Sequence, residues 1–211
     1  MFLVARAENF ARSNKLSLIS LSPNASGTGV FTVASPNSNV DRVLTLPDES
    51  GTVDTLQRSG NVIQVVNFQT GAVATGTTVI PNDNTIPQIT EGNEYMTLAI
   101  TPTSASNILL IGVVLQLATN LSSPGANMYG ALFRDAVTDA FASGSSRSVG
   151  ANQTLNIIFN HRMVAPATSA ITFRVRAGAE AAGTTTFNGV GGASVHGGVM
   201  SSSITITEYT A

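Results

Sequence analysis

Hydrophobic and polar residues alternate one for one in several short segments of the chain. In residues 154–164, Leu155, Ile157, Phe159 and Met163 fall on one face of an extended strand, and mainly polar residues fall on the other. The same alternation recurs in residues 171–176 and 203–209. Because successive side chains of a strand point to opposite faces, this pattern predicts half-buried antiparallel strands.

Other runs rich in Val, Ile, Thr and Phe are separated by turn residues, whereas the helical period is almost missing. They predict further strands at residues 62–69, 72–80, 95–100, 107–117, 128–135, 184–190 and 194–200. Many short strands with turn signals between them are typical of a sandwich or barrel. The sequence therefore predicts an all-β fold whose main part is an antiparallel β-sandwich of the jelly-roll kind.

One run is apolar on both faces. Residues 108–115, ILLIGVVL, predict a central strand covered on both sides, either by a second sheet and a loop or by a neighbouring subunit. We expect Ile108, Leu110, Val113 and Leu115 to contribute to an interface between copies. His161, in phase with the apolar face of its strand, is expected to be a hydrogen-bonded histidine on the inner face. A meeting of three copies across a trimer axis, which would make it an interface residue, is the alternative.

Charge is scarce: 10% of the 211 residues are charged, against about a quarter in an ordinary domain. A chain with so few charges stays soluble through Ser, Thr and Asn, or hides surface against copies of itself. Ten Lys and Arg against twelve Asp and Glu also leave no basic footprint for nucleic acid. We therefore expect a homo-oligomer without nucleic-acid binding.

Cysteine is absent, which excludes disulfides, thiolate metal sites and a cysteine nucleophile. The two histidines, His161 and His196, have no supporting ligands at zinc-site spacing, so neither a metal nor another cofactor is expected.

No run approaches the roughly 18 apolar residues of a membrane span, and charge inside the first residues argues against a signal peptide. Membrane insertion is therefore not expected.

The first 58 residues differ from the rest. Short apolar runs at 16–21, 30–33 and 43–46 are separated by loops rich in Ser, Pro, Asn and Gly. So little apolar surface does not offset an ordering cost of roughly 1–2 kcal/mol per residue unless the arm packs on the head or winds with identical arms. The sequence predicts an attachment arm or short shaft at 1–58 and a sandwich head at 59–211.

Residues 27–36, GTGVFTVASP, and 42–53, RVLTLPDESGTV, resemble a segment of bacteriophage tail-fibre proteins. In those proteins it leads from the shaft towards a C-terminal head. The resemblance implies a homotrimer in the virion tail that attaches to a tail or baseplate protein through its N-terminal arm and binds a host surface receptor, either a glycan or an outer-membrane protein. Repeats of His-x-His and a long repeated shaft are absent from the sequence, which favours a short fibre or a tip subunit.

Binding is better supported than catalysis. The acid pairs Asp48/Glu49 and Asp135/Asp139 have the residue types of glycosidase carboxylates, as in phage depolymerases, but the first is turn chemistry and the second flanks a loop. A Gly-x-Ser-x-Gly nucleophile motif is missing from the sequence. We expect a protein that is not an enzyme; a polysaccharide depolymerase spike remains an alternative.

Receptor contacts are expected from loops, because loops carry most binding residues. Tyr129, Arg134 and His196 are the candidates, since Tyr and Arg are frequent binding anchors and His196 sits in a glycine-rich turn. A structural virion component without receptor activity, such as a head fibre, decoration or collar protein, is the other alternative.

Overall fold

The structure, a computed structural model, describes residues 39–41, 43, 59–122 and 126–211. The chain divides into two units, Met1–Gly51 and Thr52–Ala211, and the fold described below belongs to the second. The predicted arm at 1–58, with its three short strands and the pair Asp48/Glu49, lies almost wholly outside the described residues.

Twelve strands and one short 3-10 helix make up the described part of the second unit. They are β1 (Val62–Thr70), β2 (Ala74–Gly76), β3 (Asn93–Ile100), β4 (Ile108–Thr119), β5 (Asn127–Arg134), β6 (Ala142–Arg147), β7 (Leu155–Val164), β8 (Ile171–Ala179), β9 (Thr185–Phe187), β10 (Gly189–Val190), β11 (Ala193–Ser194), η1 (His196–Gly198) and β12 (Ser202–Tyr209).

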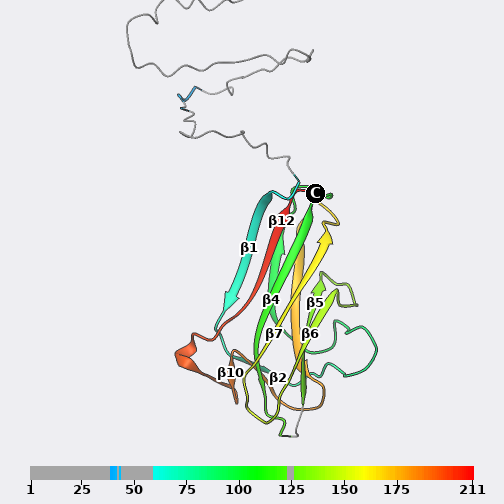
Figure 1. Cartoon of the computed structure of the whole chain (residues 1–211), viewed down its shortest axis with the longest axis vertical. Coiled ribbons are helices and arrows are strands. Elements are labelled where there is room, and N and C mark those ends of the chain that lie inside the picture. Colours follow the sequence, from blue (N-terminus) through cyan, green and yellow to red (C-terminus); the bar gives the residue numbers. More distant parts are fainter. Residues whose placement is uncertain (1–38, 42, 44–58, 123–125) are drawn as a thin grey trace, which may run out of the picture. The chain divides into compact units, whose positions relative to one another are not determined.

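The strands form two main sheets, in which every pair of neighbours is antiparallel (Figure 1). The six-stranded sheet has the order β1-β12-β4-β9-β2, with β7 also paired to β4, and the four-stranded sheet has the order β3-β8-β5-β6. A small hairpin, β10-β11, stands apart from them. The predicted all-β antiparallel sandwich is confirmed.

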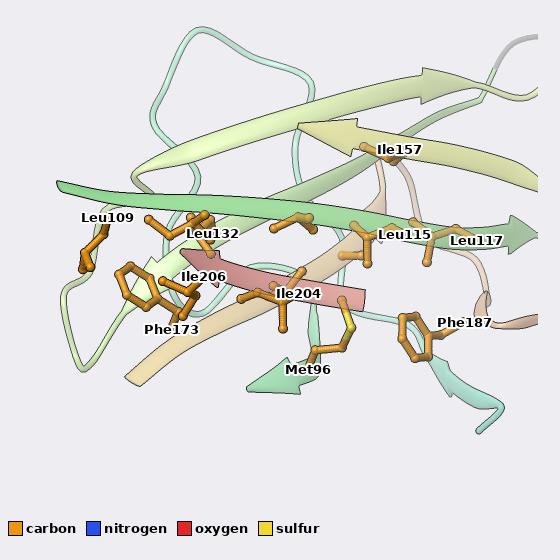
Figure 2. Packing of buried hydrophobic residues seen from close by; sticks show 14 of the residues in the cluster. Met96, Leu109, Leu115, Leu117, Leu132, Ile157, Phe173, Phe187, Ile204 and Ile206 are labelled. Atoms are coloured by element: carbon orange, nitrogen blue, oxygen red, sulfur yellow. The ribbon is translucent and has the colours of Figure 1, made fainter. Parts of the chain in front are cut away.

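The core lies between the two sheets, where alternate residues of each strand point inward (Figure 2). Figure 2 shows Leu109, Leu115 and Leu117 of β4 facing Phe173 of β8 and Met96 of β3 across this interior. All five side chains are buried. Because the inner residues follow the period of two seen in the sequence, the burial pattern explains why the alternation is visible there.

Two glycines make room for large side chains in the core. A Cβ on Gly130 of β5 would collide with Leu115, and one on Gly144 of β6 would lie 2.8 Å from Phe159 and 2.9 Å from Ile157. The missing side chains let β5 and β6 approach the six-stranded sheet closely. Glycine in a strand interior often marks such a close approach.

The outer face of the four-stranded sheet is covered by the segment 77–92. Ile80 of this segment is buried with Ala131 and Phe133 of β5 in a second, smaller core. Backbone hydrogen bonds fix the segment to the sheet, among them one from the Ile80 amide to the Ala179 carbonyl. The predicted strand at 72–80 is therefore wrong for most of its length: only β2 is a strand, and the rest is this cover.

The glycine-rich segment before β12 also departs from prediction. Residues 184–190 are split into β9 and β10 at Asn188, whose φ is 56°. Residues 194–200 do not form one strand. Ser194 ends β11, and His196–Gly198 form η1, with φ values of 51°, 66° and 83°. A positive φ does not fit an extended strand, so the apolar residues Val195 and Val199 do not alternate across a sheet there.

The sandwich has two ends, and the described chain enters and leaves it at the same one. The Gly60 amide donates to the Thr210 carbonyl at 3.0 Å, and the Thr210 amide donates to Asn61 at 2.9 Å. We call this end, with the loops 101–107, 135–141 and 165–170, the terminal pole. The far pole carries the loops 148–154 and 180–200, and Figure 1 shows β10 there, at the opposite end from the C-terminus.

Candidate functional site

The outward-facing side of the six-stranded sheet is the most distinctive surface of the described residues. We define the outer sheet face as the outward residues of β1, β12, β4 and β7. They are Val62, Val65, Asn67, Gln69, Ser203, Thr205, Thr207, Tyr209, Ile108, Leu110, Gly112, Val114, Gln116, Asn156, Ile158, Asn160, Arg162 and Val164. All are exposed or half-buried, so the described residues leave this face open.

Strand register arranges these residues in rows across the sheet. Val62 pairs with Tyr209, Tyr209 with Ile108, and Ile108 with Val164. Directly opposite residues point to the same face and contact each other. This row of four apolar or aromatic side chains lies beside the terminal pole, next to a surface hollow of about 370 Å³. Ile108, Tyr209 and Ala211 are among the residues that line the hollow.

Five apolar side chains of the outer sheet face are exposed. Leu110 is 37% exposed, Val164 54%, Val62 and Val65 56% each, and Ile158 66%. Ile158 pairs with Val114, so a second apolar pair stands further from the terminal pole. Contiguous exposed apolar surface is rare on soluble monomers and marks interaction sites.

Arg162 is the single ionic side chain of the outer sheet face, and it lies directly opposite Leu110. The other polar members are hydroxyl and amide groups, which can exchange hydrogen bonds with water for hydrogen bonds across an interface. A partner that covers this face therefore desolvates one charge only. Burying charge is the main cost of covering polar surface, so the face is suited to association.

The predicted interface residues are divided between the two sides of β4. Ile108 and Leu110 belong to the outer sheet face, whereas Val113 and Leu115 point into the core and are 1% and 0% exposed. Residues at odd and even positions of a strand point to opposite faces, so the four cannot share one interface. The prediction is wrong for Val113 and Leu115, which have no surface to offer a partner.

His161 lies on the inner side of β7, as its phase in the sequence predicts. Its imidazole makes an edge contact with the Phe141 ring, with the ring centroids 5.8 Å apart. Burial lowers its pKa below the ordinary value of 6.5. Because it faces Phe141 of its own chain, His161 is not part of the outer sheet face.

The three predicted receptor residues are not brought together. Arg134 ends β5 near the terminal pole, where its guanidinium lies 4.8 Å from the centroid of the Phe141 ring. Tyr129, near the other end of β5, packs on the small core under segment 77–92. His196 is exposed in the turn η1 at the far pole. Of the three, His196 alone stands on an exposed loop.

The carboxylates considered for catalysis have structural partners. Asp135 Oδ1 accepts a hydrogen bond of 2.9 Å from the Thr172 amide, and Asp139 Oδ1 accepts one of 2.9 Å from the Gln88 side chain. These bonds hold the loop after β5 to β8 and to segment 77–92. Within the described residues no group of three His, Cys, Asp or Glu is placed to hold a metal ion.

A buried carboxylate was missed by the sequence reasoning. Glu208 is 0% exposed and accepts hydrogen bonds from the side chains of Gln64 and Asn107 and from the backbone and hydroxyl of Thr103. Its phase with Ile204 and Ile206 in β12 is the signal that places it on the inner face. The network ties the loop 101–107 to β12 and β1.

No protein-family model matches the chain, and no curated protein matches its sequence. None of the described segments is a helix of the length and hydropathy that a bilayer crossing needs.

Among solved structures, an Eiger TNF from S. frugiperda is similar at 10% identity and TM-score 0.39, over 72% of this chain and 93% of that one. The infectious bursal disease virus Gx strain is similar at 15% identity and TM-score 0.34, over 82% of this chain and 43% of the other. Tailspike protein 4 of bacteriophage CBA120 is similar at 16% identity and TM-score 0.24, over 61% and 19%. Values this low assign neither a family nor a function.

Proposed function

We propose that the chain is a non-enzymatic structural subunit of a bacteriophage tail fibre that assembles as a homotrimer and contacts the host surface with its sandwich head. The resemblance of residues 27–53 to tail-fibre segments supports the virion tail as its location. The same residues support attachment to a tail or baseplate protein through the N-terminal arm at 1–58.

The observation that carries the proposal is the outer sheet face. A soluble monomer normally protects such a surface with charge. Here a broad sheet face offers apolar rows, hydroxyls and amides around the single cation of Arg162. A second and third copy of the chain would cover this face, with Ile108 and Leu110 near the centre of the contact.

The two poles of the sandwich suggest which part meets the host. Gly60 lies at the terminal pole, so attachment to the virion through the residues before it would place the far pole outermost. The far pole carries the turn η1 with His196 and the exposed Val199 beside it. We therefore propose that host contacts come from this pole, with His196 among them, and not from Arg134. Three copies would add avidity to weak individual contacts.

The test of assembly is the mass of the purified full-length chain by light scattering. We expect three times the chain mass of 21.7 kDa. Leu110→Glu should reduce the mass to that of the monomer, because it buries a second ionic group in the contact. Thr97→Glu, at an exposed position of β3 in the other sheet, is the matched control and should leave the trimer intact. A wild-type chain that remains monomeric at micromolar concentration would contradict the proposal.

The test of adhesion is whether the purified protein competes with the phage for the host surface. The purified trimer should reduce adsorption of the phage that carries it, and His196→Ala should weaken this effect without changing the mass. A trimer that never competes would instead favour a head fibre, decoration or collar protein. Release of reducing ends from host envelope glycans would favour a depolymerase.

A further inference from the structure

β1 is an outermost strand of the six-stranded sheet, and its second edge carries no partner among the described residues (Figure 1). It pairs with β12 alone, over its whole length from Val62 to Thr70. An unpaired strand edge presents a row of backbone donors and acceptors that can pair with another strand. Proteins usually block such edges with charge, proline or a bulge.

The other long edge strands carry ionic groups, and β1 does not. β3 has Glu94, β6 has Arg147 and β7 has Arg162. The sequence of β1, VIQVVNFQT, contains neither a charged residue nor a proline. Its one irregularity lies near the start, between Val62 and Gln64, so the seven residues from Gln64 to Thr70 form a regular ladder. Nothing in β1 itself keeps a second copy of the strand away.

The side chains at this edge are also unusually apolar for their exposure. Val65 is 56% exposed and Phe68 is 39% exposed. Phe68 pairs with the fully buried Ile204, so it belongs to the inner side of the sheet and lies open only because the sheet ends at β1. A strand added next to β1 would cover it.

We infer that β1 pairs antiparallel with β1 of a second copy through its free backbone edge, in a transient contact that oxidation can trap, whereas the trimer contact uses the outer sheet face. The regular segment is centred on Asn67, and a twofold axis there places Val66 opposite Phe68 of the other copy. Opposite residues in an antiparallel pair share a face, so both apolar side chains are covered on the inner side. The contact joins two assemblies by their sheet edges and thus goes beyond the proposed trimer.

The chain lacks cysteine, so single cysteines report on this contact without background. Single substitutions to cysteine at positions 64–70 of the full-length chain are oxidised, and the yield of disulfide dimer is measured. Equivalent residues of an antiparallel pair move apart by about 7 Å for each residue from the axis, and a disulfide needs Cα atoms within about 7 Å. The yield should therefore peak at Asn67→Cys and fall on both sides. Ser145→Cys, exposed on the edge strand β6 of the other sheet, is the control and should give little dimer.

Two charge variants separate this contact from the trimer. Phe68→Lys in the Asn67→Cys background should abolish the disulfide dimer and leave the trimer mass unchanged. Leu110→Glu in the same background should remove the trimer and keep the disulfide. A yield that is flat across 64–70, or no greater than that of the β6 control, overturns the inference whether or not the chain is trimeric.

Discussion

The side-chain amide of Asn107 donates a hydrogen bond of 2.6 Å to the carboxylate of Glu208, and both residues are buried. Asn107 precedes β4 and Glu208 lies near the end of β12, so the bond closes the terminal pole of the sandwich. Thr103 donates to the same carboxylate oxygen from its amide and its hydroxyl, each at 2.8 Å. The carboxylate thus replaces its lost hydration with several donors from the protein.

Replacing Glu208 by Ala should destabilise the fold strongly. The change removes the carboxylate that accepts from Asn107, Gln64 and Thr103, and hydrogen bonds to a charged group contribute about 1.5–3 kcal/mol each before relaxation. We expect a loss of about 3 kcal/mol in the free energy of unfolding, measured from urea denaturation. Glu94→Ala is the control: it removes a surface ion pair with Arg174 at 3.2 Å and should cost under about 1 kcal/mol.

The same network predicts a loss of stability in acid. Burial acts to raise the pKa of Glu208, but the hydrogen bonds from Gln64, Asn107 and Thr103 together outweigh it and hold the pKa below the ordinary 4.5. A carboxyl with a depressed pKa in the folded state stabilises the protein above its unfolded pKa, and this contribution is lost as the pH falls through the folded value. As the pH is lowered below about 4.5, the urea concentration at the unfolding midpoint should therefore decrease. The decrease should be less steep in Glu208→Gln. Equal slopes in both proteins would contradict this account.

Tyr95 predicts a loss of stability at alkaline pH. Its ring stacks on Phe187 at 4.8 Å, and its hydroxyl is buried without a hydrogen-bond partner among the described residues. Burial raises the pKa of Tyr95 from 10.0 to about 12. Between these values the unfolded chain loses the phenolic proton while the folded chain keeps it, so stability falls as the pH rises through this range. Tyr95→Phe should remove that fall and should be at least as stable as the wild type at neutral pH, both measured by urea denaturation.

The strands that the sequence predicted best are those with one buried face. β7, β8 and β12 alternate because the core selects every second residue, and a shift by one position would expose the whole apolar set. β4 misled the prediction because both of its faces are apolar although the fold buries only one. In such a strand, neither the period nor the composition shows that Leu110 is exposed and Val113 is buried.

The receptor candidates could not be placed from sequence, because their separation depends on how strands run through the fold. Tyr129 and Arg134 are near neighbours in sequence, yet one strand carries them towards opposite poles. The segment 77–92 was equally hidden: it contacts the sheet through isolated residues such as Ile80, without any period. Glu208 was detectable, since a charged residue in phase with Ile204 and Ile206 is a signal for a buried network.

Gly130 and Gly144 should not tolerate a methyl group. Gly130→Ala would press on Leu115, and Gly144→Ala on Phe159 and Ile157, all from within a packed core. Overpacking of this kind costs about 1–3 kcal/mol, and we expect each variant to lose stability in that range. Gly150→Ala is the control, because the nearest atom to its added carbon would be 3.7 Å away in the Gln153 side chain. Thermal unfolding followed by circular dichroism would compare the three; a Gly130→Ala protein as stable as the control would contradict the close approach of β5.

Phe141 should control the titration of His161. The Phe141 ring contacts the imidazole on one side and the Arg134 guanidinium on the other, and burial lowers the pKa of His161 below 6.5. Phe141→Ala opens the imidazole to water, which favours its charged form, so the pKa should rise towards 6.5 in the variant. The removed cation contact with Arg134 should also cost about 1 kcal/mol of stability.

NMR titration of the imidazole protons measures this shift, and the spectrum is simple because the chain has two histidines. His196→Gln assigns the signals. The lowered pKa of His161 also makes stability depend on pH. Above pH 6.5 the histidine is neutral in both states and has no effect on the free energy of unfolding. As the pH falls below 6.5 the unfolded chain binds the proton first, so the fold is destabilised. Phe141→Ala should therefore weaken the pH dependence of unfolding below pH 6.5. If the His161 titration is the same in both proteins, the ring does not shield the imidazole, and the lowered pKa needs another cause.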